Sequence, residues 1–210
     1  IRAKTDFPDL EIVSDPKEAT GKYFLFLDAD LEPLEKSWLT AMAEQLSNPR
    51  VGAVGPRILS LDTTIESAGL ILSPDGTVNS AFAGCTRDFR GANRQLQGVR
   101  NYSAVSGSCL LTRKELVDRF LLDSVSGSLN FVRDDRVCMA VEFCLALREQ
   151  GLRTVSVPYA ELRRASTKQA ASVACPDLQK RWPEMFRRDP CYNPNLASGR
   201  ADFSLGTLAN

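Results

Sequence analysis

The sequence predicts an α/β fold built on a largely parallel β-sheet with helices on both faces. Short apolar runs typical of strands alternate with longer segments whose apolar residues recur at three- and four-residue steps. This alternation favours parallel pairing, because parallel strands need a crossover connection that a helix usually supplies. Tyr23–Leu27 is the strongest strand signal, since five consecutive large apolar residues indicate a strand covered on both faces. We therefore expect it in the middle of the sheet.

Elements before residue 100 are predicted from apolar periodicity and turn residues. Between Leu34 and Leu46 the apolar side chains fall on one face of a helix, which Asn48-Pro49 ends. Asp75-Gly76 is typical of a turn between two short strands. The other segments expected here are a short strand at Leu10–Val13, a strand that begins at Val51–Val54 and a basic, mobile loop at residues 84–101.

After residue 100 the strand and helix signals continue and then weaken. The segments expected here are strands at Tyr102–Val105, Cys109–Leu111 and Arg153–Tyr159, a short helix opened by the capping box Thr112–Glu115 and a longer helix at Val137–Gln150. Two prolines exclude a helix from Asp189–Asn195. We therefore divide the chain into an α/β domain over residues 1–165 and an extended C-terminal tail over residues 166–210 that packs on the same domain.

Composition excludes several classes of function. The chain has no histidine, which excludes Ser-His-Asp and Cys-His nucleophile systems and histidine-based zinc sites. Its 26 basic and 26 acidic residues balance, so no nucleic-acid partner is predicted. No apolar run approaches the roughly 18 residues of a membrane-spanning helix, and the first residues lack the apolar stretch of a signal peptide. We expect a cytoplasmic protein, at most peripheral at the inner membrane face.

Cofactor motifs are equally scarce. The glycine-rich dinucleotide and P-loop signatures are missing. The 6 cysteines contain no C-x-x-C spacing and lie mostly in apolar segments, so we interpret them as buried thiols rather than disulfides or metal ligands. Acid–base or metal chemistry must therefore rest on carboxylates.

Asp28 and Asp30 are the first candidates for such chemistry. They follow the Tyr23–Leu27 strand directly, and ligands of open α/β sheets bind beyond the carboxyl ends of strands. Residues i and i+2 of an extended chain point the same way, so both carboxylates can converge on one divalent cation that also contacts phosphate oxygens. The alternative interpretation is a solvated pair of acids at a strand end with an Asx-turn.

Five segments, in this order along nearly the whole chain, resemble the inverting glycosyltransferases of family 2, which have the GT-A fold. They are Glu18–Asp30, Val51–Leu59, Asn101–Arg113, Val157–Leu162 and Arg181–Leu196. The last is similar to members that build bacterial surface polysaccharides. The resemblance implies a GT-A-like, Rossmann-like fold. The family's opening strand and helix units are incomplete here, which implies a shortened donor half or a chain that is a fragment.

The resemblance also implies ligands and roles. A nucleotide-sugar donor and a saccharide or lipid-linked saccharide acceptor are expected, with Mg²⁺ or Mn²⁺ accompanying the nucleotide diphosphate. Asp30, with Asp28, would hold this metal and the donor. Ser106, Gly107 and Ser108 resemble the segment beside the family's acceptor site. A carboxylate would take the proton of the acceptor hydroxyl, whose oxygen then attacks the anomeric carbon.

Two of the sequence's departures from the family concern the base and the metal site. The residue matching the family's base is Ala140, so Glu142 is the first substitute base and Asp134 and Asp135 are the next candidates. A histidine that completes the metal site in many members is replaced by the segment that begins Arg163-Arg164.

These departures leave other interpretations open. Glu142 also fits an exposed acid on a helix face, and Asp134 and Asp135 fit a solvated pair at a helix start. Arg163-Arg164 and the basic loop fit a solvated surface better than phosphate contacts. For the whole chain the rival function is a catalytically inactive, glycosyltransferase-like binding or scaffold domain within a larger assembly protein.

Overall fold

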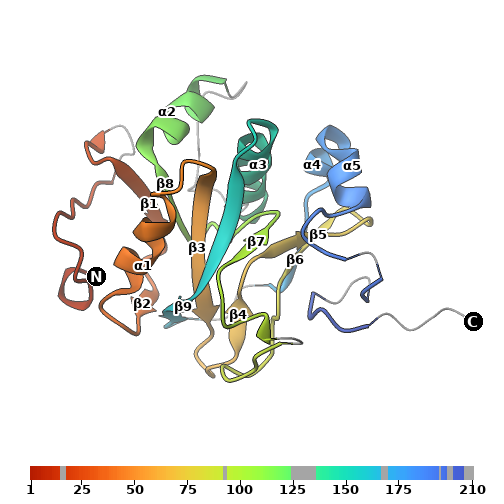
Figure 1. The fold of residues 1–210 in the computed structure, drawn as a ribbon, viewed down its shortest axis with the longest axis horizontal. Helices are drawn as coiled ribbons and strands as arrows, with labels where there is room; N and C mark the ends of the chain where they lie inside the picture. Colours follow the sequence, from red (N-terminus) through yellow and green to blue (C-terminus); the bar gives the residue numbers. More distant parts are fainter. Residues whose placement is uncertain are drawn as a thin grey trace, which may run out of the picture.

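The structure is a computed structural model, and it describes residues 1–14, 18–91, 94–123, 136–166, 170–193, 195–197 and 201–205 (Figure 1). The strands are β1 (Tyr23–Leu27), β2 (Leu31–Pro33), β3 (Val51–Leu59), β4 (Ile65–Ser67), β5 (Leu70–Leu72), β6 (Thr77–Ser80), β7 (Arg100–Tyr102), β8 (Cys109–Arg113), β9 (Arg153–Arg164) and β10 (Ser172–Ala174). The helices are the 3₁₀ turn η1 (Arg2–Lys4), α1 (Trp38–Gln45), α2 (Lys114–Asp123), α3 (Arg136–Glu149), α4 (Pro176–Arg181) and α5 (Pro183–Arg187). Helices separate β2 from β3 and β8 from β9 as the predicted alternation requires, but the strands from β3 to β8 follow one another without a described α-helix between them.

Within these residues, the central sheet has the order β1-β8-β3-β9-β2, with β4 paired to β3 and β7 paired to β9. Only β3 and β9 pair in parallel, so the predicted predominance of parallel pairs is wrong. β8 is antiparallel to both β1 and β3, which makes β1, β3 and β9 run in the same direction. The alternation of strands and helices therefore predicted the direction of these three strands, and β8 separates two of them.

β1 lies at one end of the described sheet, so its predicted central position is also wrong. Its residues alternate between buried and half-buried. Phe24 and Phe26 pack in the core under α2 and α3, and Tyr23, Leu25 and Leu27 pack on the α1 side. An apolar run thus reports that both faces of a strand are covered, but not that both of its edges are paired.

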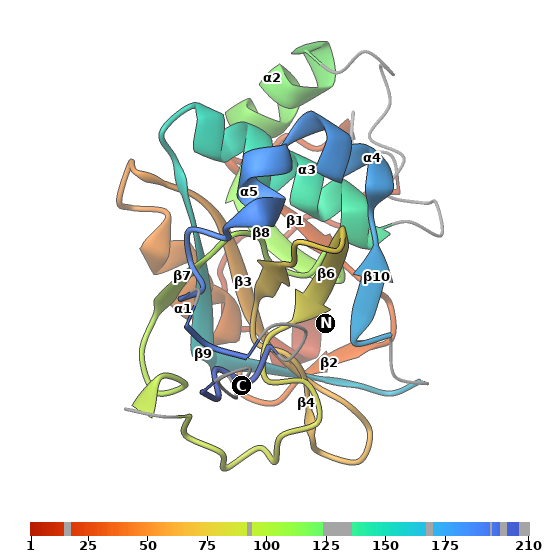
Figure 2. The same ribbon diagram turned by 90° about the vertical axis from the view of Figure 1, so that its right-hand side faces the viewer.

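The sheet is the middle of three layers (Figures 1 and 2). On one face Trp38 and Met42 of α1 are fully buried against Val54 and other apolar residues of the sheet. On the other face α2 and α3 cover the sheet, with Phe143 of α3 at 0% exposure. No helix among the described residues is long and apolar enough to cross a membrane.

A second sheet of order β10-β6-β5 lies beside α3. The predicted turn at Asp75-Gly76 joins β5 to β6, and Gly76 adopts φ +84°, a region open to glycine. Residues 10–13 do not form the predicted strand. Residues 84–91 and 94–99 lie between β6 and β7 without a strand or α-helix.

The C-terminal segment is not simply extended, because β10, α4 and α5 precede the turns that contain Asp189. Trp182 and Phe186 are buried in the α3 core. Cys138 and Cys175 form a disulfide between α3 and the start of α4, so the interpretation of these two as thiols is wrong. Their Cα atoms are 5.7 Å apart, which only the folded packing reveals. The other cysteines are free.

Candidate functional site

Asp28 and Asp30 lie in the turn between β1 and β2, at the carboxyl end of β1 as predicted. The Asp28 amide donates to the Ser108 carbonyl at 2.8 Å, and the Leu31 amide donates to the Asp28 carbonyl at 3.2 Å. The Asp28 side chain is 9% exposed and that of Asp30 is 32% exposed. The turn therefore presents one buried and one accessible carboxylate at the same end of the sheet.

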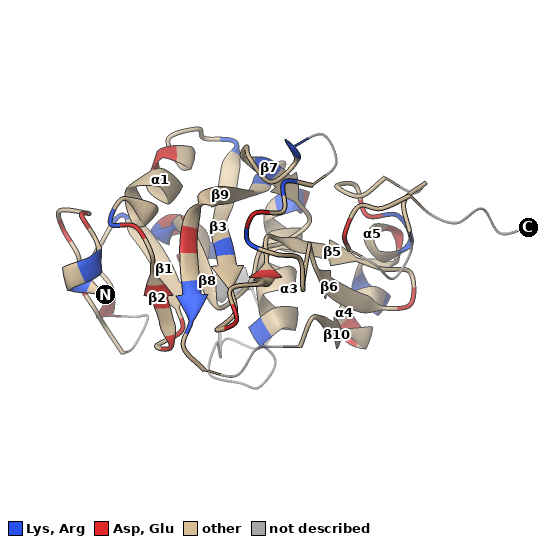
Figure 3. Cartoon of the chain, turned by 90° about the horizontal axis from the view of Figure 1, so that it is seen from below, with Lys and Arg blue, Asp and Glu red and all other residues tan. Residues whose placement is uncertain are grey.

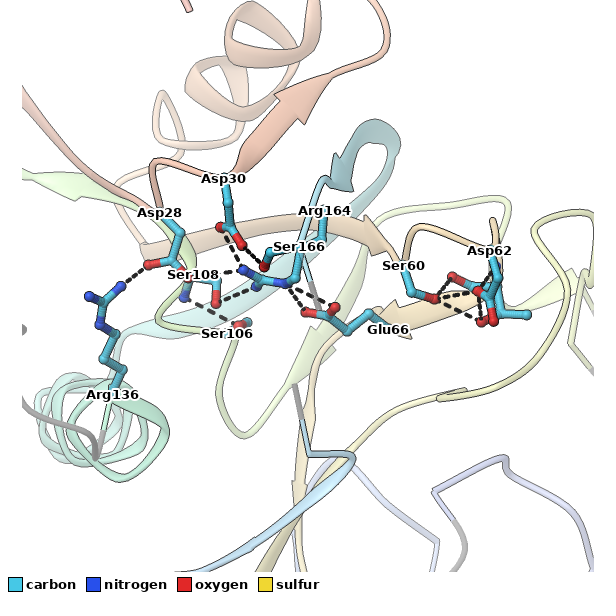
Figure 4. A network of polar contacts seen from close by, with 11 residues as sticks. Asp28, Asp30, Ser60, Asp62, Glu66, Ser106, Ser108, Arg136, Arg164 and Ser166 are labelled. Carbon is cyan, nitrogen blue, oxygen red and sulfur yellow. Dashed lines mark hydrogen bonds and ion pairs between the residues drawn. The ribbon is translucent and has the colours of Figure 1, made fainter. Parts of the chain in front are cut away.

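The guanidinium of Arg164 lies between these carboxylates (Figure 4). Its Nη1 donates to Asp30 Oδ1 at 2.7 Å and reaches Asp28 Oδ2 at 3.4 Å. Its Nε donates to Glu66 Oε1 at 2.9 Å and its Nη2 to Ser108 Oγ at 2.9 Å. Only 3% of the Arg164 side chain is exposed. All three of its nitrogens therefore have acceptors inside the fold.

Secondary structure explains how these groups meet. β9 continues to Arg164 because its last residues pair with β2, where Arg164 is opposite Leu31. β4 pairs with the end of β3 and brings Glu66 to the same point. Arg136 at the start of α3 is ion-paired with Asp28, and the Ser166 hydroxyl donates to Asp30.

We call this set the Arg164 cluster. Its members are Asp28, Asp30, Glu66, Ser108, Arg136, Arg164 and Ser166 (Figure 4). Acidic and basic segments lie side by side at this end of the sheet (Figure 3).

The charges and hydrogen bonds within the cluster shift the pKa values of Asp30 and Arg164. Burial raises the pKa of the Asp30 carboxyl, but hydrogen bonds from Ser166 and Arg164 and the Arg164 charge bring it below its ordinary 3.8. Burial lowers the pKa of Arg164, but Glu66 and Asp30 raise it above its ordinary value.

The cluster does not fit the divalent cation predicted for Asp28 and Asp30. Among the described residues, no group of three or more His, Cys, Asp or Glu side chains is arranged to hold a metal ion. The oxygens that would coordinate a cation accept hydrogen bonds from Arg164, Arg136 and Ser166. A guanidinium therefore lies where the two carboxylates converge.

Ser108 belongs to the cluster and Ser106 and Gly107 precede it, so the structure brings the predicted acceptor segment next to the predicted donor residues. Ser106 Oγ accepts from the Ser108 amide at 3.3 Å. A Cβ added to Gly107 would lie 2.7 Å from the Arg136 carbonyl oxygen and 3.2 Å from the Ala140 Cβ. The glycine therefore permits the close approach of this segment to α3.

Of the predicted base candidates, only Glu142 lies within the described residues. Ala140 is fully buried against Gly107. Glu142 lies two residues further along the same helix, a rotation of about 200°, and pairs with Arg181 Nη1 at 2.6 Å. Its carboxylate is therefore directed at α4 and not at Asp28. Asp134 and Asp135 lie outside the described residues.

Sequence reasoning missed Glu66, Arg136 and Ser166 and assigned Arg164 to a solvated surface. Arg163 fits that assignment, since its side chain is 42% exposed and lies 3.9 Å from Glu32. Neighbouring residues of a strand point to opposite faces, so Arg164 points inward. The available signal was Glu66 itself, because an acid in an apolar strand needs a buried partner.

Comparison with known proteins identifies the family. The model of "Glycosyl transferase family 2" matches residues 17–121, half of the chain. The "O-antigen biosynthesis protein RfbC" of Myxococcus xanthus is 27% identical over 210 residues, covering 90% of this chain and 15% of that protein. The "Uncharacterized protein y4gI" of Sinorhizobium fredii is 27% identical over 201 residues, covering 90% and 22%. The chain thus spans less than a quarter of the length of these relatives.

Among solved structures, the mannosyltransferase PcManGT from Pyrobaculum calidifontis, in complex with GDP-Man and Mn²⁺, has 19% identity and a TM-score of 0.42. The similarity covers 74% of this chain and 35% of that one. The family match begins before β1 and ends in α2, so it contains Asp28, Asp30 and the segment at residues 106–108. The predicted α/β fold class is confirmed, and the chain belongs to glycosyl transferase family 2.

Proposed function

We propose that this domain transfers a sugar from a nucleotide-sugar donor to a saccharide or lipid-linked saccharide acceptor in surface-polysaccharide biosynthesis. The observation that carries the proposal is the family match over residues 17–121, which includes both the Asp28–Asp30 turn and the Ser106–Ser108 segment. The relationship to an O-antigen biosynthesis protein supports the polysaccharide pathway. The greater length of both relatives supports the presence of further domains in the working protein. A cytoplasmic location, peripheral at the inner membrane face, is part of this proposal.

In this proposal the donor diphosphate binds at the Asp28–Asp30 end of the sheet, and the acceptor binds beside Ser106–Ser108. The acceptor hydroxyl loses its proton to a carboxylate as its oxygen attacks the anomeric carbon, and the nucleotide diphosphate leaves with the electrons of the broken bond. Asp134 and Asp135 are our candidates for this base. They directly precede Arg136 in the sequence, and Arg136 contacts Asp28. The candidate bases therefore lie only one or two positions along the chain from a side chain at the proposed donor site.

The proposal is tested by measuring nucleotide binding first and sugar transfer second. Saturation-transfer NMR with UDP, GDP, dTDP and CMP is expected to show binding of at least one nucleotide, and the matching nucleotide sugars are then screened for nucleotide release with oligosaccharide acceptors. Asp134→Asn together with Asp135→Asn should slow release by about 10²- to 10⁴-fold. Asp118→Asn, which changes an exposed carboxylate on α2, is the matched control. Absence of binding by every nucleotide would reject the proposal.

A further inference from the structure

The Arg164 cluster has the geometry of a cation site whose cation is a side chain. Three carboxylates, Asp28 and Asp30 from the β1–β2 turn and Glu66 from β4, contact the guanidinium of Arg164. Glu66 is 4% exposed and Arg164 is 2% exposed, so the arrangement is internal to the fold. Arginine keeps its proton in proteins, which makes this a fixed positive charge at every physiological pH.

We infer that Arg164 takes the place of the divalent cation in this site, so that the domain binds its nucleotide diphosphate without Mg²⁺ or Mn²⁺. The inference rests on the proposed function for the identity of the ligand, but the exclusion of the metal rests on the cluster alone. Arg164 Nη1 is 2.7 Å from Asp30 Oδ1, and a metal on the same carboxylate would lie about 2.0–2.6 Å from its oxygen. Both positive charges cannot occupy this space without strong repulsion.

Displacement of Arg164 by a metal is also unfavourable. Glu66 accepts two contacts from Arg164 Nε, at 2.9 Å and 3.0 Å, and is too deeply buried for solvent to replace them. Movement of the guanidinium would leave a buried carboxylate without its paired charge. The hydrogen bond from Arg164 Nη2 to Ser108 Oγ would be lost as well.

Arg136 is the part of the cluster that a diphosphate can reach. Its side chain is 43% exposed, and it starts a helix of 14 residues whose amino end favours anions. The cluster contains three carboxylates and two guanidiniums, a formal charge of −1. Because Arg136 is the more exposed of the two guanidiniums, we expect a diphosphate to bind on the Arg136 side, where it does not displace the acids from Arg164.

The test measures metal and nucleotide binding separately. Isothermal titration with MnCl₂ alone should give no binding to the wild-type domain or to Arg163→Ala, the matched control for an exposed neighbouring arginine. Arg164→Ala removes the guanidinium from Asp28, Asp30 and Glu66 and should gain one Mn²⁺ site. Arg164→Lys keeps a positive charge and should exclude Mn²⁺ as the wild type does. If circular dichroism shows that Arg164→Ala is unfolded, the titrations of the wild type and of Arg164→Lys with MnCl₂ decide whether the site excludes Mn²⁺.

Titration with UDP and GDP then follows in EDTA or in MnCl₂. We expect wild-type nucleotide affinities that agree within about twofold between the two conditions. Asp30→Asn removes one negative charge and should leave nucleotide affinity equal or higher, whereas a metal ligand could not be replaced without loss. One Mn²⁺ bound by the wild type, or nucleotide binding that requires Mn²⁺, would overturn the inference. Absence of nucleotide binding in both conditions would reject the proposed function, and the Mn²⁺ titration would still decide the inference.

Discussion

Glu66 and Asp189 are carboxylates of similar burial, at 4% and 6% exposure, but the protein satisfies them in different ways. Glu66 pairs with a buried guanidinium. Asp189 accepts instead from the Leu72 amide at 2.8 Å, the Ser103 hydroxyl at 2.7 Å and the Cys191 amide at 2.6 Å. These hydrogen bonds come from neutral donors and fix the C-terminal segment to β5, with the charge of Arg148 as a smaller contribution.

This difference distinguishes Asp189, which fixes a segment to the fold, from Glu66, which belongs to the candidate functional site. Burial raises the pKa of Asp189 above its ordinary value, against the hydrogen bonds from Leu72, Ser103 and Cys191 that lower it. The pKa of Asp30 is lowered by Ser166 and Arg164 despite its burial. Glu66 is instead paired with a second buried charge, which also contacts Asp28 and Asp30.

The largest effect is expected from Arg164→Ala. The substitution removes the buried guanidinium that pairs with Glu66, Asp28 and Asp30, and we expect a loss of about 3–5 kcal/mol in the free energy of unfolding. Urea denaturation followed by tryptophan fluorescence measures it. Arg163→Ala removes an exposed arginine and should cost less than about 1 kcal/mol. Equal effects of the two variants would contradict the burial of the Arg164 cluster.

Asp189→Ala is expected to have the next largest effect. It leaves the Leu72 and Cys191 amides and the Ser103 hydroxyl without their acceptor, which should cost about 2–3 kcal/mol. The loss should be local, with faster proteolytic cleavage after α5 than in the sheet. Uniform cleavage along the chain would show that Asp189 does not act as an anchor.

The two acids should respond to pH in opposite directions. The depressed pKa of Asp30 means that its contribution to stability is complete above 3.8 and is lost as pH falls through the lower folded value. The raised pKa of Asp189 means that its contribution is greatest below 3.8 and is lost as pH rises through the higher folded value. Unfolding curves of Asp30→Asn and Asp189→Asn between pH 3 and pH 7 test these signs. If the free energies of unfolding of both variants differ from wild type with the same dependence on pH, these signs are refuted.

Glu142→Gln should have the smallest effect. Its partner Arg181 is 57% exposed and Glu142 is 32% exposed, so solvent screens the pair and we expect less than about 1 kcal/mol. Differential scanning calorimetry should detect little change in Tm. A loss comparable to that of Asp189→Ala would show that the contact between α3 and α4 depends on this charge pair.

The sequence predicted the parts of the fold that local pattern determines. The helices near Trp38–Gln45 and Arg136–Glu149, the turn at Asp75-Gly76 and the position of Asp28 and Asp30 at a strand end all agree with the structure. Pairing was not predictable in the same way, because apolar periodicity reports covered faces and not neighbours at the edges. β8 entering antiparallel between β1 and β3, and the edge position of β1, follow from tertiary pairing.

The candidate site was only half predictable for a related reason. The predicted strand ended at Tyr159, whereas β9 continues to Arg164 through its pairing with β2. Because the strand is five residues longer than predicted, Arg164 lies within it and is buried against Glu66 instead of lying on the surface. The Cys138–Cys175 disulfide was missed because its cysteines are 37 residues apart and meet only when α4 packs on α3.

The most direct test of the account is a crystal structure of the domain grown with UDP or GDP and MnCl₂, with diffraction data collected at the manganese absorption edge. We predict the Arg164 guanidinium between Asp28, Asp30 and Glu66, a diphosphate beside Arg136 and no anomalous peak on these carboxylates. An anomalous peak coordinated by Asp30, with Arg164 moved away from Glu66, would contradict it.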